Sequence, residues 1–162
     1  MKQYHLNKLS PELGAEISGI DLSKDFNEEI QNKIYDDLIN YKVLFFREQN
    51  ITPQFHVEFA KSFGSIEEPH PVYPHVEGFP EIVLLENDKD NPPDTDEWHT
   101  DVTFKNDPPF ASVLYSKTIP EVGGDTLWSS LSKIYDALPH ELKAQIENLR
   151  AIHDMGSFRN NY

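Results

Sequence analysis

Proline and glycine cut this chain into short segments, and this limits the folds that it can adopt. Four of its 12 prolines fall within residues 67–81, and another pair, Pro92 and Pro93, follows shortly after. Proline removes a backbone donor and interrupts helices, so both stretches predict loops. The apolar runs between such loops are short, as in residues 42–46 and 82–86. Runs of this length between turn residues are typical of β-strands.

Helical periodicity occurs in three regions. In residues 27–41, isoleucine and leucine recur every four positions, and Asn27 is a suitable N-cap. In residues 51–64, Thr52 and the proline after it suit the start of a helix whose phenylalanines share one face. Residues 132–149 predict two short helices with a break at the proline between them.

Most of the remaining apolar runs predict strands. They comprise residues 13–22, 42–46, 82–86, 97–104, 111–119, 120–130 and 150–155. Short strands, long loops and a few helices indicate a β-rich α+β fold, compatible with a jelly-roll barrel that carries helices on its outside. A jelly roll has about eight strands, and the predicted strands fall short of that number. We therefore expect a single domain over residues 1–162 that is truncated at its C-terminus.

The charge of the chain argues against several classes of partner. Its 14 Lys and Arg residues face 28 Asp and Glu residues, which gives a net charge of −14. Such an acidic protein repels phosphates, so we expect no nucleic-acid partner. We see no basic amphipathic stretch, signal peptide or membrane-length apolar run, and we expect a cytoplasmic protein with no membrane partner. Because cysteine is absent, histidine is the soft metal ligand to follow.

A histidine and an aspartate two residues apart form the pattern with the clearest chemical meaning. In DEWHTDVTF, His99 and Asp101 would point to the same face of a strand. An imidazole and a carboxylate can fill adjacent corners of an octahedron, and a second histidine would complete the facial triad of non-heme Fe(II) oxygenases. Taken alone, the triplet is more often a solvated strand face or a turn with a capping aspartate. The long loop before it, the apolar residues around it and GGDTLW after it favour the metal site.

The other histidines offer alternatives for a third ligand. His153 lies in a predicted strand and is the better candidate, which would make the chain a cupin-like metal-binding module. His140 follows Pro139 at an expected helix start, where a solvated or capping role is simpler. His75 and His56 are expected in a loop and on a helix surface, respectively.

The order of the motifs resembles that of the taurine/α-ketoglutarate dioxygenase family, whose members depend on Fe(II) and 2-oxoglutarate. The resemblance covers nearly the whole chain and includes LGAEISGIDL, VLFFREQNITP, HPVYPHVEG, NPPDTDEWHTDVTF and GGDTLWSS. The HPVYPH segment is similar to the taurine-specific members in particular. The resemblance implies a double-stranded β-helix of the clavaminate synthase-like kind, with flanking helices, of which this chain would be the N-terminal portion.

The resemblance also implies roles at a catalytic iron site. His99 and Asp101 would be two of the three Fe(II) ligands. Thr126, in GGDTLW, would hydrogen-bond a carboxylate of the co-substrate 2-oxoglutarate. In the family, the distal histidine ligand and the two arginines that bind 2-oxoglutarate and the sulfonate come later in the sequence than residue 162. His153 matches a family position that is not a ligand, so a structural or pocket-lining role is implied for it.

A second group of residues would bind the substrate. His70 and Tyr73 would hold its sulfonate, and Ser157 and Phe158 would contribute a backbone contact and a ring contact. The segment that holds the last two is one residue shorter than in the family. Thr95 stands where the taurine-specific members have an asparagine that contacts the substrate amine. This difference concerns substrate choice and leaves the iron site unchanged.

The implied activity is an oxidation. The enzyme would use dioxygen and 2-oxoglutarate to hydroxylate taurine or a similar small sulfonate, and it would release sulfite, an aldehyde, succinate and CO2. Because of Thr95, a sister dioxygenase that acts on an alkyl sulfate or an aryloxyacetate is the alternative. A truncated, non-catalytic relative is a further alternative, since only two iron ligands are identified. A homo-oligomer is left open.

Overall fold

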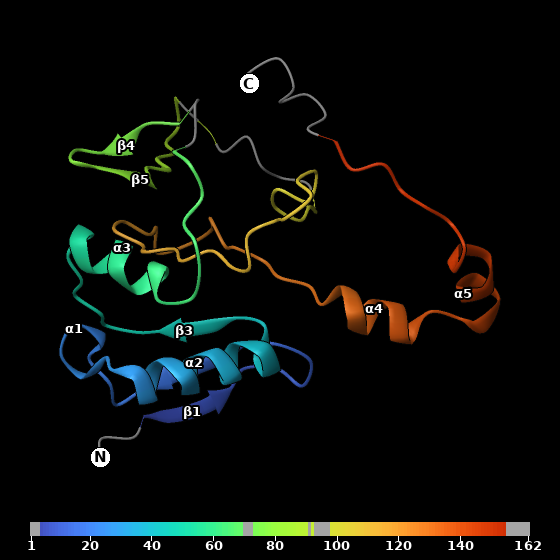
Figure 1. The fold of residues 1–162 in the computed structure, drawn as a ribbon, viewed down its shortest axis with the longest axis horizontal. Coiled ribbons are helices and arrows are strands. Elements are labelled where there is room, and N and C mark those ends of the chain that lie inside the picture. The colour runs from blue at the N-terminus through green and yellow to red at the C-terminus, as the bar shows by residue number, and fades with distance from the viewer. Residues whose placement is uncertain (1–3, 70–72, 91, 93–97, 155–162) are drawn as a thin grey trace. The chain divides into compact units, whose positions relative to one another are not determined.

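The computed structural model describes residues 4–69, 73–90, 92 and 98–154 (Figure 1). The chain divides into two compact units. Unit 1 comprises residues 1–51 and 115–150, and unit 2 comprises residues 52–114 and 151–162. None of the helices in the described ranges is long and apolar enough to cross a membrane.

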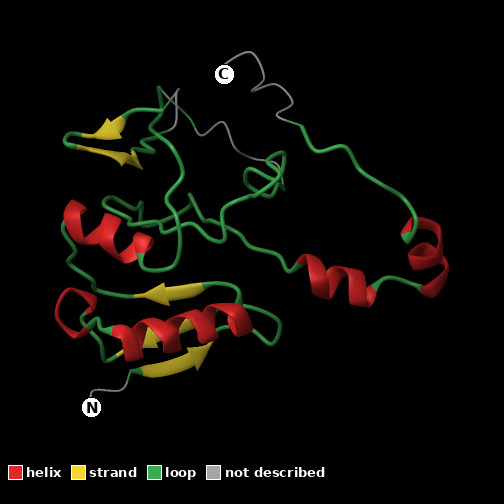
Figure 2. Ribbon diagram, in the orientation of Figure 1, coloured by secondary structure: helices red, strands yellow, loops and turns green. Residues whose placement is uncertain are grey.

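A three-stranded sheet forms the centre of unit 1 (Figure 2). Strand β1 (His5–Lys8) pairs antiparallel with β2 (Ala15–Ser18), and β2 pairs parallel with β3 (Leu44–Phe46). Parallel neighbours need a crossover connection, and helices α1 (Leu22–Asp25) and α2 (Glu28–Tyr41) provide it. Helix α2 packs against β3. The strands predicted within residues 13–22 and 42–46 are thereby confirmed as β2 and β3, whereas β1 was not predicted.

Alternating residues of β2 and one stripe of α2 supply the core of unit 1. Ala15 and Ile17 are 0% and 1% exposed, and Ile30 and Ile34 of α2 are buried as well. Residues two apart in a strand and four apart in a helix share a face, so each element buries one side. The predicted helix and its cap are confirmed, because the Asn27 side chain accepts a hydrogen bond from the Ile30 N–H at 3.0 Å.

A buried tyrosine connects the N-terminal segment to α2. The Tyr4 hydroxyl donates a hydrogen bond to Asp37 Oδ2 at 2.5 Å, and Lys33 Nζ lies 2.9 Å from the same oxygen. The Lys33 ammonium also lies 3.6 Å from the centre of the Tyr4 ring, a cation–π geometry. Burial, and then the hydrogen bond to the Asp37 carboxylate, raise the pKa of Tyr4 above its ordinary value.

Unit 2 contains one helix and one hairpin. Helix α3 (Pro53–Lys61) begins at the predicted cap, where Thr52 Oγ1 accepts from the Phe55 N–H at 3.2 Å. The predicted phenylalanine face is confirmed, since the ring centroids of Phe55 and Phe59 are 5.9 Å apart and those of Phe59 and Phe63 are 5.1 Å apart. Strands β4 (His75–Val76) and β5 (Phe79–Val83) form an antiparallel pair, and α3 packs on β5.

The two helices predicted near the end of the chain are confirmed. Helix α4 (Leu131–Ala137) is capped by Ser130, and α5 (His140–Ile146) begins directly after Pro139. Proline has no N–H to donate and its φ is fixed, so it separates the two helices. Neither helix buries a residue. Large apolar side chains such as Leu131 and Ile134 are therefore exposed.

Several predicted strands are not present in the described parts of the chain. Residues 98–104, 111–119, 120–130 and 150–154 have neither strand nor sheet pairing, and only residues 82–83 of the predicted run 82–86 belong to β5. A strand requires a neighbour for its backbone groups, and these segments have none in the described ranges. Their apolar side chains are accordingly exposed: Leu114 by 69%, Leu127 by 70% and Ile152 by 94%.

The described residues close no jelly-roll barrel, and the predicted jelly roll was itself expected to be incomplete at its C-terminus. The described residues form one three-stranded and one two-stranded sheet, together with five helices. The α+β composition is as predicted, but a barrel requires a continuous ring of paired strands. The predicted combination of helices and short strands is therefore confirmed, whereas the described residues do not form a closed sheet.

The Tyr4 contact predicts a measurable dependence of stability on the tyrosine hydroxyl. Tyr4→Phe removes a hydrogen bond to a charged group, so we expect the free energy of unfolding at pH 7 to fall by about 1–2 kcal/mol. The folded state retains the Tyr4 proton above pH ~10, where the unfolded chain releases it. Stability then decreases as pH rises, so the advantage of the wild type over Tyr4→Phe should shrink above pH ~10.

Urea unfolding of both proteins at pH 7 and at pH 11 measures these two effects. Tyr135→Phe is the matched control, because Tyr135 is 44% exposed on α4 and its change should alter stability by less than about 0.5 kcal/mol. Equal stability of Tyr4→Phe and the wild type at pH 7 would contradict the proposed contribution of this contact.

Candidate functional site

The predicted metal-ligand pair is brought together in unit 2. His99 Nε2 lies 3.2 Å from Asp101 Oδ1, and the two side chains are 52% and 69% exposed. The pattern predicted that these side chains would point the same way, and they do. It also predicted a dry wall of apolar residues around them, which is wrong, since both side chains are open to solvent.

A turn, and not a strand, holds the pair together. Residues 101–104 form the turn, and the Lys105 N–H donates to the Val102 carbonyl at 3.0 Å. Val102 has φ +55°, a left-handed conformation that β-branched residues rarely adopt. The strand predicted over residues 97–104 is therefore corrected to a turn in its described part.

The separation of the two ligand atoms fits a metal ion. Two ligands at right angles, each about 2.1 Å from an ion, lie about 3 Å apart. The 3.2 Å between His99 Nε2 and Asp101 Oδ1 matches this spacing. One imidazole and one carboxylate, with the remaining directions open, are two-thirds of the facial triad that suits Fe(II) oxygenases.

No third ligand is assembled in the described part of the chain. No group of three His, Asp or Glu side chains there could hold a metal ion. His153, the alternative third ligand, contacts Thr103 Oγ1 through Nδ1 at 3.0 Å and belongs to no such group in the described residues. The cupin-like alternative, which needs His153 beside His99 and Asp101, therefore lacks support in the described residues.

Two contacts from distant segments fix the turn. The first is the His153–Thr103 contact, which spans 50 residues of sequence. The second is an ion pair between Lys105 and Glu67, whose side chains are about 40% exposed. Both contacts lie within unit 2, and each involves a residue no more than four positions after Asp101. Sequence reasoning missed both contacts, because a local sequence pattern does not indicate contacts between residues that are so far apart in the sequence.

Most of the predicted substrate-binding residues lie outside the described ranges. These are His70, Thr95, Ser157 and Phe158. Tyr73 is described: it is half-buried, in a bend that leads into β4. The bend is closed by a hydrogen bond from the Leu84 N–H to the Pro74 carbonyl at 2.8 Å, which places Tyr73 at the end of the hairpin.

The predicted 2-oxoglutarate ligand Thr126 lies in unit 1. It is exposed, in a segment with neither helix nor strand, so its predicted place on a strand is wrong. The same segment is anchored by Trp128, whose ring meets the edge of Phe45 at a centroid distance of 5.3 Å. The hydroxyl of Thr126 thus faces solvent within unit 1.

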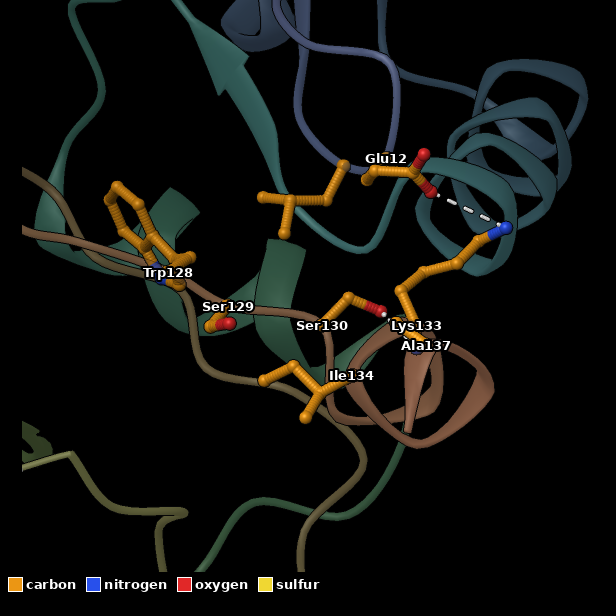
Figure 3. Close-up of a pocket in the computed structure, with 8 residues that line it drawn as sticks. Glu12, Trp128, Ser129, Ser130, Lys133, Ile134 and Ala137 are labelled. Carbon is orange, nitrogen blue, oxygen red and sulfur yellow. Dashed lines mark hydrogen bonds and ion pairs between the residues drawn. The ribbon is translucent and has the colours of Figure 1, made fainter. Parts of the chain in front are cut away.

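A groove of about 270 Å³ adjoins this anchor (Figure 3). Its apolar wall consists of Leu13, Trp128 and Ile134, and an ion pair between Lys133 Nζ and Glu12 Oε2 at 3.3 Å lies at its side. None of the predicted site residues lines it. Its contacts attach α4 and the segment before it to the loop that precedes β2, which is a structural role.

The remaining histidines have structural surroundings. His56 lies on α3, half-buried, with Nε2 2.9 Å from the Val113 carbonyl, so it is less exposed than predicted. His75 belongs to β4 and not to a loop, which corrects its prediction. His140 is exposed at the first position of α5, as predicted.

Comparisons with known proteins agree with the family resemblance of the sequence motifs. The family model described as "Taurine catabolism dioxygenase TauD, TfdA family" matches residues 5–161. The chain is 40% identical over 153 residues to an alkylsulfatase of Acinetobacter baylyi, which covers 94% of this chain and 47% of that protein. It is 39% identical over 144 residues to an alpha-ketoglutarate-dependent sulfate ester dioxygenase of Pseudomonas putida, which covers 87% and 46%.

A solved structure supports the same relationship. The structure of a taurine dioxygenase from Burkholderia xenovorans matches with a TM-score of 0.79 and 38% identity, over 93% of this chain and 53% of that chain. The aligned part of the chain therefore shares the fold of that dioxygenase, and the predicted jelly roll is supported only to this extent, because the described residues close no barrel. The chain spans about half the length of the relatives that it matches.

The position of Trp98 predicts an optical signal for metal binding. The chain has two tryptophans, and Trp98 is 71% exposed next to His99. In a Trp128→Phe variant, the emission comes from Trp98 alone. We expect Co(II), which is paramagnetic, to quench this emission when it binds His99 and Asp101. A fluorescence titration measures the effect, and additional His99→Ala should abolish it; equal quenching with and without His99 would contradict the metal site.

Proposed function

The chain belongs to the taurine catabolism dioxygenase TauD, TfdA family, and from this we propose that the protein is an Fe(II)- and 2-oxoglutarate-dependent dioxygenase of small sulfonates or sulfate esters. The family match over residues 5–161 carries the proposal, and the 3.2 Å between the His99 imidazole and the Asp101 carboxylate, the length of an ordinary ion pair, is also compatible with two adjacent iron ligands. The names of the relatives support the substrate class.

His99 and Asp101 would hold the iron, with a third ligand from a residue outside the described ranges. When bound together, Fe(II) and 2-oxoglutarate supply the activation of dioxygen. The protein's part is to present His99 Nε2 without a proton and Asp101 as a carboxylate, since only those forms bind a metal. The exposure of both side chains leaves directions open for the co-substrate and dioxygen. The Thr126 hydroxyl would donate a hydrogen bond to a carboxylate of 2-oxoglutarate.

The anionic end of the substrate calls for hydrogen-bond donors. We assign His70 and Tyr73 to this role: a protonated imidazole gives a charge-assisted hydrogen bond to a sulfonate or sulfate oxygen, and a phenol gives a neutral one. Ser157 and Phe158 would contact the rest of the molecule. Of these four residues, Tyr73 is described, half-buried at the end of the hairpin.

Residue 95 bears on the choice between taurine and an alkyl sulfate. Taurine carries an ammonium group, which can donate a hydrogen bond to the carbonyl oxygen of an asparagine side chain. The threonine at position 95 has a shorter side chain with a hydroxyl and a methyl group instead. An alkyl chain needs no such acceptor and gains from the methyl contact. Thr95 and the two sulfate-ester relatives support an alkyl sulfate as the substrate, whereas the matching taurine dioxygenase structure supports taurine about equally.

The products distinguish the two substrate types. One oxygen atom of dioxygen enters succinate, and the other hydroxylates the carbon next to the sulfur group, with release of CO2. In a sulfonate, the hydroxylated carbon then loses its bond to sulfur, which gives an aldehyde and sulfite. In a sulfate ester, the bond from carbon to the ester oxygen breaks, which gives an aldehyde and sulfate.

Product analysis of the protein at its natural length is the direct test. With Fe(II), 2-oxoglutarate and oxygen, we expect hexyl sulfate to yield sulfate and succinate in equal amounts, and at a higher kcat/KM than taurine yields sulfite. Asp101→Ala should abolish both reactions. No succinate with any sulfonate, sulfate ester or aryloxyacetate would favour a non-catalytic relative, and faster turnover of taurine would restore the taurine assignment.

Thr95→Asn tests the substrate choice at one position. An amide that accepts from the taurine ammonium adds a hydrogen bond to a charged group, which is about 1.5–3 kcal/mol. We expect the ratio of kcat/KM for taurine over hexyl sulfate to rise at least about tenfold, since 1.4 kcal/mol corresponds to that factor. Thr95→Val is the matched control, because it keeps the shape without an acceptor and should leave taurine turnover low. An unchanged ratio of the two kcat/KM values in Thr95→Asn would show that residue 95 does not contribute to recognition of the taurine ammonium group.

A further inference from the structure

We propose that His153 is a positioning residue for the turn that carries Asp101, through its contact with Thr103. The inference rests on the proposed function, because it concerns how the two iron ligands are held. His153 Nδ1 lies 3.0 Å from Thr103 Oγ1, and Thr103 follows Asp101 by two residues. A shift of Thr103 therefore changes the direction of the Asp101 carboxylate with respect to His99.

The turn needs support from outside its own sequence. Both ligand side chains are more than half exposed, so packing does not hold them. Val102 lies between Asp101 and Thr103 with φ +55°, and a β-branched residue keeps such a conformation only where its surroundings impose it. Thr103, which His153 contacts, is the residue directly after Val102.

The second tether of the turn is less directional. Lys105 pairs with Glu67 through side chains that are about 40% exposed, and the His153–Thr103 contact is exposed as well, so the two tethers differ in geometry and not in burial. An ammonium tolerates many approach angles, whereas a ring nitrogen and a hydroxyl at 3.0 Å define one. His153 is thus the contact that can set the orientation of the turn.

The chemistry of the contact allows a conservative replacement. An asparagine side chain has an amide at about the reach of the imidazole Nδ1, and it can donate to or accept from a hydroxyl. An amide is also a much weaker iron ligand than an imidazole. His153→Asn should therefore keep a positioning role and would lose a ligand role, which separates this inference from His153 as the third ligand.

The experiment is a Co(II) titration of the protein at its natural length, followed by visible absorption and calorimetry. We expect His153→Ala and Thr103→Val each to raise the Kd for Co(II) about tenfold, the lower end of the effect of losing a residue that orients a metal ligand. The double variant should bind no more weakly than Thr103→Val alone, because Thr103→Val already removes the His153 contact, together with the 3.4 Å contact from Thr100 Oγ1. His153→Asn should restore the wild-type Kd and absorption band.

His56→Ala is the matched control, since His56 also makes one long-range contact, to the Val113 carbonyl, within unit 2. Its Co(II) Kd should equal that of the wild type. A wild-type Kd in His153→Ala overturns the inference, and so does a loss in both histidine variants together with a lower melting temperature of the metal-free protein. If Co(II) bound equally well without His99, the proposed function would fail first, and the inference with it.

Discussion

The fold of unit 1 depends on β2, a short strand with a neighbour on each side. Pairing with β1 and β3 satisfies its backbone groups, and Ala15 and Ile17 can then be buried almost completely. Because β3 runs parallel to β2, the chain must cross from one end of the sheet to the other, and α2 makes that crossing. The burial of Ile30 and Ile34 follows from this one topological requirement.

The later apolar segments show what happens when such a neighbour is missing from the described residues. Residues 111–119 contain five apolar residues among nine, a share similar to that of β2, yet they form no strand, and Leu114 is exposed. β-Propensity describes how a side chain fits a sheet that already exists, and it does not supply the partner. The sequence therefore predicted where strands could form but not which of them would pair.

Elements with local signals were predicted well. Asn27 and Thr52 accept the capping hydrogen bonds that their positions suggested, and Pro139 divides α4 from α5. Each of these interactions joins residues no more than a few positions apart, so the sequence contains all of its determinants. The curvature after Asp101 was missed for the opposite reason, since Val102 is a poor residue for a left-handed turn and its neighbours in sequence give no warning of it.

The proximity of His99 and Asp101 was predicted, whereas the exposed turn that holds them was not, and their role as iron ligands stays a prediction. A strand and the observed turn both bring His99 and Asp101 to one side, so the spacing alone could not tell them apart. The difference matters for the chemistry. A strand would be held rigid by hydrogen bonds to neighbouring strands. This turn is instead held by contacts of Thr103 and Lys105 with residues up to 50 positions away in the sequence. The geometry of an exposed pair of ligands is then only as well defined as these contacts, and for that reason residues that touch no substrate belong to the description of the site.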